Sequence, residues 1–537
     1  MKLTDLTIRD LFTPGVKLTF LVGAGCSIDK PSCLPAGRRM MNALLDYTCA
    51  KSELDKIKKL EGLRFEQLIE ILSERLDPEL KIIDFYGLCD KPNLQHFFLA
   101  EMMNQGHFVF TTNFDFLIEY ALIHSGVPKN KIKVVITKED FEKFDNPHEL
   151  YSDGLKTLYK IHGSTENIIT GIPTRASLIA TIQAFGANKE GENAFQLEGF
   201  KQPAFLNLTK DRTLVVLGYS GSDDFDVVPT LKVLEDVRDI IWINHIQNDK
   251  KKENVYEIRV EDIQNYETLA KVDQILVDIK RMNYVNRVFR VDINTSIMVK
   301  ELVSTQNEIS SDIFDIDIHE WLSNNIETPN EVTQLYVPYK IYFDFDLFED
   351  ALPILDKMLK FAEEKKDLKL KTFILSAMGS IYEEKGEIQD ALTLFEEALQ
   401  LDDHLEDSIG KATRLNNIGG IYYAQGHYQE ALKRYKEVLQ IDEQSKNSSA
   451  ISIDLNNIGM IFRAVGNYPK ALILFKEALK ISENLGNLKS KAVILNNLGG
   501  IYRDQGDYQE ASKRYEEALQ INVQLGDLRR KALLLNN

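Results

Sequence analysis

The residues best suited to chemistry lie in four short motifs in the first half of the chain. They bring together glycines, an Asn/Asp pair, a histidine and serines, in the segments Gly23-Ala24-Gly25-Cys26-Ser27, Thr111-Thr112-Asn113-Phe114-Asp115, His162-Gly163 and Gly218-Tyr219-Ser220. Glycines let a turn bring bare backbone N–H groups against a pyrophosphate. An amide can orient water or a ribose hydroxyl, and an imidazole, which titrates near neutrality, is a natural general base.

Each motif directly follows a short apolar run, and this predicts how the four are brought together. The runs cover residues 18–22, 108–110, 158–161 and 214–217. Short apolar runs bounded by glycine are typical of buried parallel strands. Ligands bind at the carboxyl ends of such strands. We therefore expect an α/β, Rossmann-like parallel-sheet domain with all four motifs at one edge of the sheet.

Taken singly, each motif also fits a purely structural interpretation. The glycine-rich segment lacks the third glycine of the usual dinucleotide fingerprint, because Ile28 stands there. Asp115 has the position of a cap for the helix that the following residues predict. His162 fits a hydrogen-bonded core histidine as well as a catalytic one. The combination of motifs favours a common site.

The identity and order of the motifs resemble the sirtuin family of NAD-consuming proteins, over residues 15–245. Residues 23–27 match the family's G-A-G-x-S, and residues 111–115 are similar to its T-Q-N-x-D, with Thr112 in place of glutamine. His162-Gly163 matches the H-G pair, and Gly218-Tyr219-Ser220 resembles G-T-S. Ile243-Asn244 resembles the I-N pair on the adenosine side.

This resemblance implies that NAD is the ligand and gives the matched residues their roles. His162 would be the general base, and Asn113 and Asp115 would complete the catalytic group. The residues implied to bind NAD are Gly23, Ala24, Gly25, Ser27, Arg38, Thr112, Gly218, Ser220 and Asn244.

Two departures from the family bear on the reaction. Deacylating sirtuins carry a zinc module with two C-x-x-C pairs after the H-G motif, whereas all four cysteines here precede His162 and none has that spacing. We therefore expect no zinc site of this kind. The family's I-P-D-F-R segment corresponds to residues 34–38, where Gly37 replaces the phenylalanine near the nicotinamide. Both departures favour hydrolysis over acyl transfer, as in bacterial defence-type sirtuins.

The second half of the chain repeats every 40 residues. The period is marked by Gly379, Gly419, Gly459 and Gly499, each within a similar frame. The pattern resembles the tetratricopeptide repeat, whose usual unit has 34 residues. We expect small residues where two helices touch, and the six additional residues mostly between one repeat's second helix and the next repeat's first. A degenerate earlier unit is expected at residues 346–355.

Asparagines recur in the first helix of successive repeats, at Asn417, Asn457 and Asn497. Asparagine is a poor residue for a helix interior. Two interpretations remain open: a ladder that grips an extended peptide, or hydrogen bonds between adjacent helices.

Composition narrows the classes of partner. The 537-residue chain has a formal net charge of -18 and a pI of about 5.1. Binding to nucleic acid usually rests on basic patches, so we expect no nucleic-acid partner. No apolar run is long enough for a membrane span or a secretory signal. Four scattered cysteines fit a reducing, cytoplasmic location.

These patterns predict a fused chain. Residues 1–305 would form the sirtuin-like domain, with a helical insertion at 51–105, followed by a linker at 306–330 and a repeat array at 331–537. Stacked repeats need a polar cap at each end. We expect the array to be truncated at Asn537, or covered there by another repeat or chain.

The predicted function is an NAD+ glycohydrolase that releases nicotinamide and ADP-ribose. The resemblance to bacterial defence-type sirtuins implies an antiphage effector, and a hydrolase that empties the cell of NAD must be off by default. Its repeat array would sense a protein or peptide trigger or drive assembly into a homo-oligomer. The alternatives are an NAD-dependent protein deacylase whose repeats recruit the client, and a non-enzymatic adaptor that only binds NAD or ADP-ribose.

Overall fold

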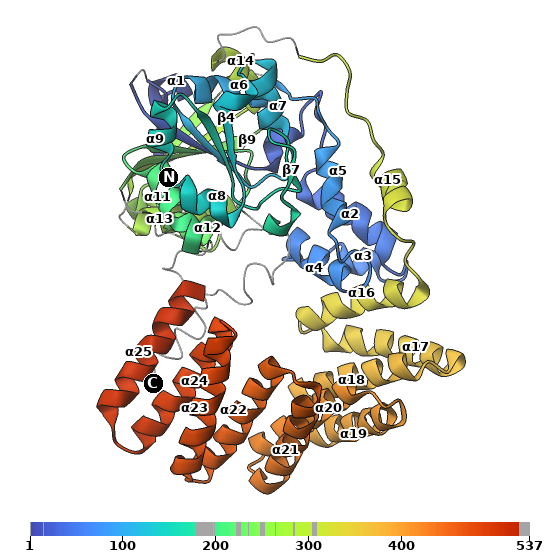
Figure 1. The fold of residues 1–537 in the computed structure, drawn as a ribbon. Helices are drawn as coiled ribbons and strands as arrows, with labels where there is room; N and C mark the ends of the chain where they lie inside the picture. Colours follow the sequence, from blue (N-terminus) through green and yellow to red (C-terminus); the bar gives the residue numbers. More distant parts are fainter. Residues whose placement is uncertain are drawn as a thin grey trace. The chain divides into compact units, whose positions relative to one another are not determined.

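The computed structural model divides into two compact units (Figure 1). The residues that it describes are 2–13, 15–178, 197, 199–221, 227–232, 234, 236–246, 253–263, 265–282, 285–302 and 309–525. The first unit comprises Met1–Tyr47 and Lys58–Thr328, and the second comprises Thr48–Ile57 and Pro329–Asn537. The predicted domain boundaries stay predictions, and the predicted end of the array falls outside the described residues.

The first unit is built on a twisted sheet, which has nine strands within the described residues. In spatial order these are β1 (Lys2–Leu3), β10 (Asn254–Glu257), β11 (Val285–Ile293), β9 (Val237–His245), β8 (Thr213–Leu217), β2 (Leu18–Val22), β3 (Phe108–Thr111), β5 (Lys156–Lys160) and β4 (Ile132–Val135). From β11 to β4 all neighbours are parallel, and β10 and β1 add an antiparallel edge. The predicted parallel-sheet domain is confirmed, and the four motif runs are β2, β3, β5 and β8.

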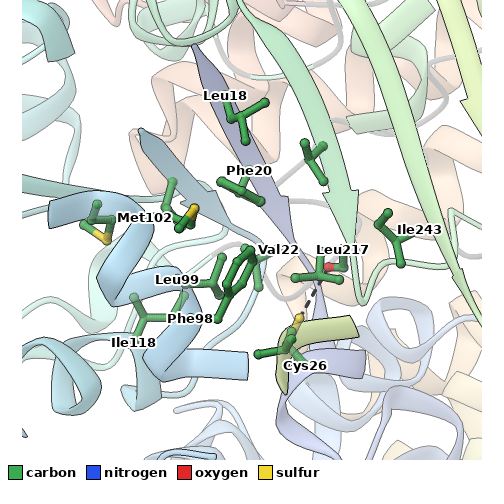
Figure 2. Packing of buried hydrophobic residues seen from close by; sticks show 14 of the residues in the cluster. Leu18, Phe20, Val22, Cys26, Phe98, Leu99, Met102, Ile118, Leu217 and Ile243 are labelled. Carbon is green, nitrogen blue, oxygen red and sulfur yellow. Dashed lines mark hydrogen bonds between the residues drawn. The ribbon is translucent and has the colours of Figure 1, made fainter. Parts of the chain in front are cut away.

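Helices cover both faces of this sheet. Those packed on one face are α1 (Ile8–Leu11), α6 (Leu94–Asn104), α7 (Leu117–His124) and α14 (Thr295–Leu302), and those on the other are α8 (Lys138–Lys143), α11 (Gln202–Thr209), α12 (Val227–Lys232) and α13 (Lys271–Arg281). The strands are apolar on both sides, since Phe20 and Val22 join one core cluster while Leu21 joins the other. In Figure 2, Phe20 and Val22 lie beside Phe98 and Leu99 of α6.

The first unit has further helices and a two-stranded ribbon. They are α2 (Gly37–Thr48), α4 (Phe65–Arg75), α5 (Asp84–Gly87), α9 (Pro147–Ser152), α15 (Ile318–Asn325) and the ribbon of β6 (Glu166–Asn167) and β7 (Ile172–Pro173). The segment predicted as a helical insertion therefore carries α4, α5 and α6 in this unit, and α3 (Leu54–Ile57) in the second.

The second unit continues as antiparallel helix pairs, which confirms the predicted all-α solenoid. The helices are α16 (Glu331–Asp344), α17 (Phe348–Lys365), α18 (Leu368–Glu384), α19 (Ile388–His404), α20 (Ser408–Ala424), α21 (Tyr428–Ser445), α22 (Ser448–Ala464), α23 (Tyr468–Asn484), α24 (Leu488–Asp504) and α25 (Tyr508–Leu525). The degenerate unit expected at residues 346–355 falls in α17, where Ala351 is buried.

The 40-residue period of glycines has a packing cause. A Cβ on Gly379, Gly419, Gly459 or Gly499 would lie 2.7–3.0 Å from the ring of the aromatic residue sixteen positions later. Those residues are Phe395, Tyr435, Phe475 and Tyr515. The first helix of each pair therefore needs a residue without a side chain where the ring of the second helix packs.

The prediction for the six additional residues of each repeat is wrong. Only three residues, 405–407, separate α19 from α20, and three more, 425–427, separate α20 from α21. The extra residues therefore lengthen the helices, which span 17 or 18 residues from α18 onward. Longer helices bury more apolar surface between neighbouring repeats than longer loops would.

The asparagines in the first helices bond to one another between repeats. Asn497 Nδ2 donates to Asn456 Oδ1 at 2.8 Å, and Asn457 Nδ2 donates to Asn416 Oδ1 at 3.3 Å. Asn497 is also buried. At these two positions the geometry supports the helix-to-helix interpretation, because the amide hydrogens are already used inside the array.

A buried carboxyl in the array predicts a pH-dependent stability. Asp454 on α22 is 1 % exposed, and burial, followed by the nearby Asp442, raises its pKa from 3.8 to about 8. The folded state favours the protonated form of Asp454. Its contribution to stability is therefore fully present at pH values below the pKa of the unfolded state, and it is lost as pH rises through the pKa of the folded state. We expect Asp454→Asn, which mimics the protonated form, to stabilise the array near pH 8 and to change little near pH 4.

Urea unfolding followed by far-ultraviolet circular dichroism at both pH values measures this difference. Asp356→Asn, at an exposed position of α17, is the matched control and should show no such pH dependence. An Asp454→Asn variant less stable than the wild type near pH 8 would contradict the assignment.

Candidate active site

A cavity of about 440 Å³ lies at the carboxyl ends of β2, β3, β5 and β8. Its position is the switch point of the sheet, since β3 follows β2 on one side and β8 lies on the other. Ten of the twelve residues predicted for the site line it, namely Ala24, Gly25, Ser27, Arg38, Thr112, Asn113, Asp115, His162, Gly218 and Ser220. A volume of this size is typical of small-molecule sites.

The other two predicted residues do not line the cavity. Gly23 lies under the turn, where a Cβ would come within 2.6 Å of the carbonyl oxygen of Gly218. Asn244 is the second-to-last residue of β9, and its Nδ2 donates to Asp292 Oδ1 of β11 at 2.8 Å. The amide of Asn244 is therefore engaged across the sheet, and its role toward adenosine stays a prediction.

The glycine-rich turn packs against the loop after β8. Gly25 N–H donates to the carbonyl of Gly218 at 2.7 Å, and Gly23 N–H donates to that of Leu217 at 3.0 Å. These two N–H groups are not bare, contrary to the expectation from sequence. Gly218 has a φ of +67°, and a Cβ there would lie 2.5 Å from the backbone nitrogen of Cys26. The glycines thus allow two loops to touch, which shapes the cavity wall.

A chain of buried hydrogen bonds connects the floor of the cavity. His96 Nδ1 accepts from the backbone N–H of Asn93 at 3.1 Å, so the proton of the neutral ring lies on Nε2. Burial lowers the pKa of His96 to about 4, which keeps it neutral. Nε2–H can then donate to Ser27 Oγ at 3.2 Å, and the Ser27 hydroxyl donates to Asp115 Oδ2 at 2.7 Å.

His96 is the residue that the sequence analysis missed. It is fully buried in the first turn of α6, and its role depends on contact with loops far away in the chain. The only signal in the sequence is Asn93 three residues earlier, which has the spacing of a helix cap. A cap alone does not say which ring nitrogen faces Ser27.

Asn113 and Tyr219, which line the cavity, each have a buried polar atom with no hydrogen-bond partner within the described structure. Asn113 Nδ2 donates weakly to Asp115 Oδ2 at 3.3 Å, which turns Oδ1 away from that network, and Oδ1 is unbonded. Tyr219 Oη is likewise buried and unbonded. Unpaired buried polar atoms are costly unless a ligand or water completes them. Asn113 Oδ1 and Tyr219 Oη are therefore candidate partners for a ligand.

The comparison with protein families matches both halves of the chain. A family described as "SIR2-like domain" matches residues 107–239, and one described as "Tetratricopeptide repeat" matches residues 372–444 and 451–522. The chain contains a SIR2-like domain and tetratricopeptide repeats. The predicted fusion is confirmed at this level. The first motif, residues 23–27, precedes the matched range, yet its Ala24, Gly25 and Ser27 line the same cavity of the SIR2-like domain.

Solved structures match parts of the chain. BtubC from P. vanneervenii is 25% identical over 36% of this chain and 81% of its own, with a TM-score of 0.34. Aspartyl phosphate phosphatase F from Bacillus subtilis is 16% identical over 38% and 54%, with a TM-score of 0.36. A Rap protein complexed with competence and sporulation factor is 20% identical over 38% and 57%, with a TM-score of 0.33. The search of curated proteins finds no match.

His162 of the SIR2-like domain lies on the cavity wall beside aromatic rings. It is 8 % exposed, and its ring centroid is 6.4 Å from that of Phe114. Phe114 in turn lies 6.3 Å from Tyr86, another lining residue. Gly163 follows with a φ of +78°, so the chain turns sharply after the imidazole. Because His162 is mostly buried beside these aromatic rings, we expect a ligand to reach its imidazole through the cavity.

Asp115 accepts a hydrogen bond at the start of α7 and also joins the Ser27 network, while its catalytic role stays a prediction. Its Oδ1 accepts the N–H of Leu117 at 3.1 Å at the start of α7, while Oδ2 joins the Ser27 network. The backbone carbonyl of Asp115 accepts from Lys160 Nζ at 2.5 Å, and Lys160 pairs with Glu119 at 3.1 Å. Burial raises the pKa of Glu119, and the charge of Lys160 opposes that rise. This buried pair holds the loop after β3 in place.

The Ser27 network predicts a measurable loss of stability. Ser27→Ala leaves His96 Nε2–H without its acceptor and removes one donor from Asp115. We expect the free energy of unfolding to fall by about 1–3 kcal/mol, the usual cost of unpaired buried groups. Denaturation followed by tryptophan fluorescence measures it, because both tryptophans, Trp242 and Trp321, lie in the first unit.

The control for this change is Ser152→Ala. Ser152 is exposed and makes one hydrogen bond, to the carbonyl of His148 at 2.9 Å. Its removal should change stability by no more than about 0.5 kcal/mol. Equal effects of the two substitutions would show that the Ser27 network adds nothing to the free energy of unfolding.

Metal-ligating groups, thiols and apolar helices bear on the class of protein. Among the described residues, no group of three or more His, Cys, Asp or Glu side chains is arranged to hold a metal ion. Cys26, Cys49 and Cys89 are buried free thiols, and Cys33 is partly buried. In the same described part of the chain, no helix has the length and apolar character needed to cross a membrane.

Proposed function

We propose that the SIR2-like domain is an NAD+ glycohydrolase that releases nicotinamide and ADP-ribose. The observation that carries this proposal is the meeting of His162 and the unbonded Asn113 Oδ1 in one cavity, formed by four loops distant in sequence. A general base and an acceptor for a hydroxyl or water are what the hydrolysis of a ribosyl bond requires.

The proposed reaction assigns a task to each group. NAD+ would lie across the strand ends with its nicotinamide ribose near His162. Asn113 Oδ1 would accept a hydrogen bond from the attacking water or a ribose hydroxyl, and His162 would take the proton. The bond from ribose C1′ to the nicotinamide nitrogen breaks, nicotinamide leaves with the electron pair, and water supplies the new C1′–O bond. One NAD+ and one water give nicotinamide, ADP-ribose and a proton.

The loop before α2 favours hydrolysis over protein deacylation. Ala36 and Gly37 line the cavity where the family carries a larger residue near the nicotinamide. Small side chains leave room for water beside the ribose carbon. The cysteine spacing adds to this argument, since all four cysteines precede His162. The deacylase therefore remains the second candidate.

The repeats supply the proposed control. Tetratricopeptide arrays bind proteins and peptides and carry no chemistry of their own, so in our proposal the array senses a protein or peptide trigger or assembles the chain into a homo-oligomer. The physiological role would be antiphage defence in the cytoplasm, with NAD breakdown released by infection. This role rests on the family resemblance and not on the chemistry of the site.

The test is an NAD+ cleavage assay on the full chain. We would follow nicotinamide and ADP-ribose by chromatography, with and without an acetyl-lysine peptide, and in cells with and without phage infection. Release of both products without peptide supports the hydrolase. Release only with peptide, together with an acylated ADP-ribose, would replace it with the deacylase. Absence of release in every condition would leave only a binding role.

A further inference from the structure

A second cavity lies at the opposite edge of the sheet from the candidate active site. It has a volume of about 670 Å³ and is formed around the amino-terminal ends of β2, β3 and β8. Lys17 and Leu18 enter it where β2 begins, His107 and Phe108 where β3 begins, and Arg212 just before β8. None of these residues belongs to the site proposed for NAD.

The centre of this cavity is a buried arginine. Arg212 is 2 % exposed, its Nε donates to Thr19 Oγ1 at 2.9 Å, and its Nη2 donates to the carbonyls of Leu18 and Gly106 at 2.6 and 3.1 Å. Its guanidinium carbon lies 3.8 Å from the ring centroid of Phe108. All these partners are neutral. Within the described residues no carboxylate pairs with Arg212, and Nη1 has no acceptor there.

An unpaired buried cation is unusual, because burial of a charge is costly without a counter-ion. Burial lowers the pKa of Arg212 to about 10, and this value still leaves it charged at neutral pH. Its charge also acts on its neighbours. Burial and then the charge of Arg212 lower the pKa of His107 to about 4, and the same two causes, followed by the charge of Lys17, lower the pKa of His148.

Positive side chains outnumber carboxylates around this cavity, although the chain as a whole is acidic. The chain carries a net charge of -18, yet Lys17 and Arg212 face one lining carboxylate among the described residues, Glu101. Glu101 accepts from Gln105 Nε2 at 3.2 Å on the same helix. The wall is also rich in rings, with Phe98, Phe108, Tyr151 and His148 among the lining residues.

We propose that this second cavity is a binding site for a small organic anion with an aromatic ring, whose phosphate or carboxylate group pairs with Arg212 and Lys17. Arginine suits this task because its planar fork can meet two oxygens of one anion. Anion binding would supply the missing counter-ion, and the aromatic wall would hold the ring. The volume accommodates a ligand of nucleotide size.

Isothermal titration of the full chain tests this site, with AMP as the phosphate probe and 4-hydroxybenzoate as the carboxylate probe. Adenosine serves as the uncharged comparison. Lys17→Glu reverses an exposed charge at the rim and leaves the packing of Arg212 intact. We expect it to weaken anion binding at least about tenfold, and added salt to weaken binding in the wild type. The matched control is Lys129→Glu, an exposed position that does not line the cavity.

A second variant separates this site from the candidate active site. Asn113→Ala alters the other cavity, so binding at the second cavity should survive it unchanged. Val16→Trp, which fills the second cavity, should abolish that binding. Loss of all anion binding in Asn113→Ala with no effect of Lys17→Glu would overturn the proposal, as would the failure of both anions to bind the wild type.

Discussion

His162→Ala should lower the rate of nicotinamide release from NAD+ by about 10²–10⁴-fold, the range that a positioned general base contributes. The imidazole lines the cavity wall with Asn113 and is mostly enclosed. Because alanine there removes the base and leaves the loops in place, NAD+ should still bind. The measurement pairs the cleavage rate with NAD+ binding by calorimetry.

The control for this substitution is His124→Ala. His124 is the last residue of α7 and is exposed, so its removal should leave the cleavage rate unchanged. A companion variant, Asn113→Ala, should also lower the rate, since it removes the unbonded Oδ1. Full activity in both His162→Ala and Asn113→Ala would refute the site assignment.

Gly163→Ala should be the most damaging single substitution in the SIR2-like domain. Gly163 has a φ of +78°, and a Cβ there would overlap the backbone carbonyl of Ser177. Two costs add: the left-handed conformation, about 1–2 kcal/mol, and the overlap with a backbone that cannot swing aside, about 1–3 kcal/mol. We expect the free energy of unfolding to fall by about 3 kcal/mol, with loss of NAD+ cleavage because His162 moves with the loop.

Gly171→Ala separates the two costs. Gly171 has a φ of +72°, but nothing lies within 4 Å of the Cβ that it would gain. It should therefore show only the conformational cost and keep its activity. Tryptophan fluorescence during denaturation measures both losses, because both tryptophans lie in the first unit, as do Gly163 and Gly171. Equal stability losses in the two variants would contradict the packing argument for the turn after His162.

The two units respond to different experiments, because their packing has different origins. The parallel sheet is built from contacts between strands far apart in sequence, whereas each repeat mostly touches its neighbours. The stability effects of substitutions at Ser27 or Gly163, in the first unit, should therefore be measured by tryptophan fluorescence. Those of substitutions at Asp454, in the second unit, should be measured by helical circular dichroism. Helical signal that follows tryptophan fluorescence in every variant would show that the units unfold together.

The sequence by itself determined the architecture. The apolar runs that became β2, β3, β5 and β8 were identifiable because strands of a covered parallel sheet are buried on both faces. The glycine period identified the repeats, because each first helix must accommodate a ring from the second. Ten of twelve site residues also reached one cavity, since neighbouring parallel strands end at the same edge.

Only the tertiary structure decided which atoms in that cavity are open. It assigned the N–H groups of Gly23 and Gly25 to backbone carbonyls, turned Asn244 toward Asp292, and linked His96 to Ser27. It likewise left Arg212 without a carboxylate partner among the described residues. These outcomes depend on hydrogen bonds between segments dozens to hundreds of residues apart. Local spacing specifies a strand or a helix, but the pairing of distant polar groups follows from how those elements pack.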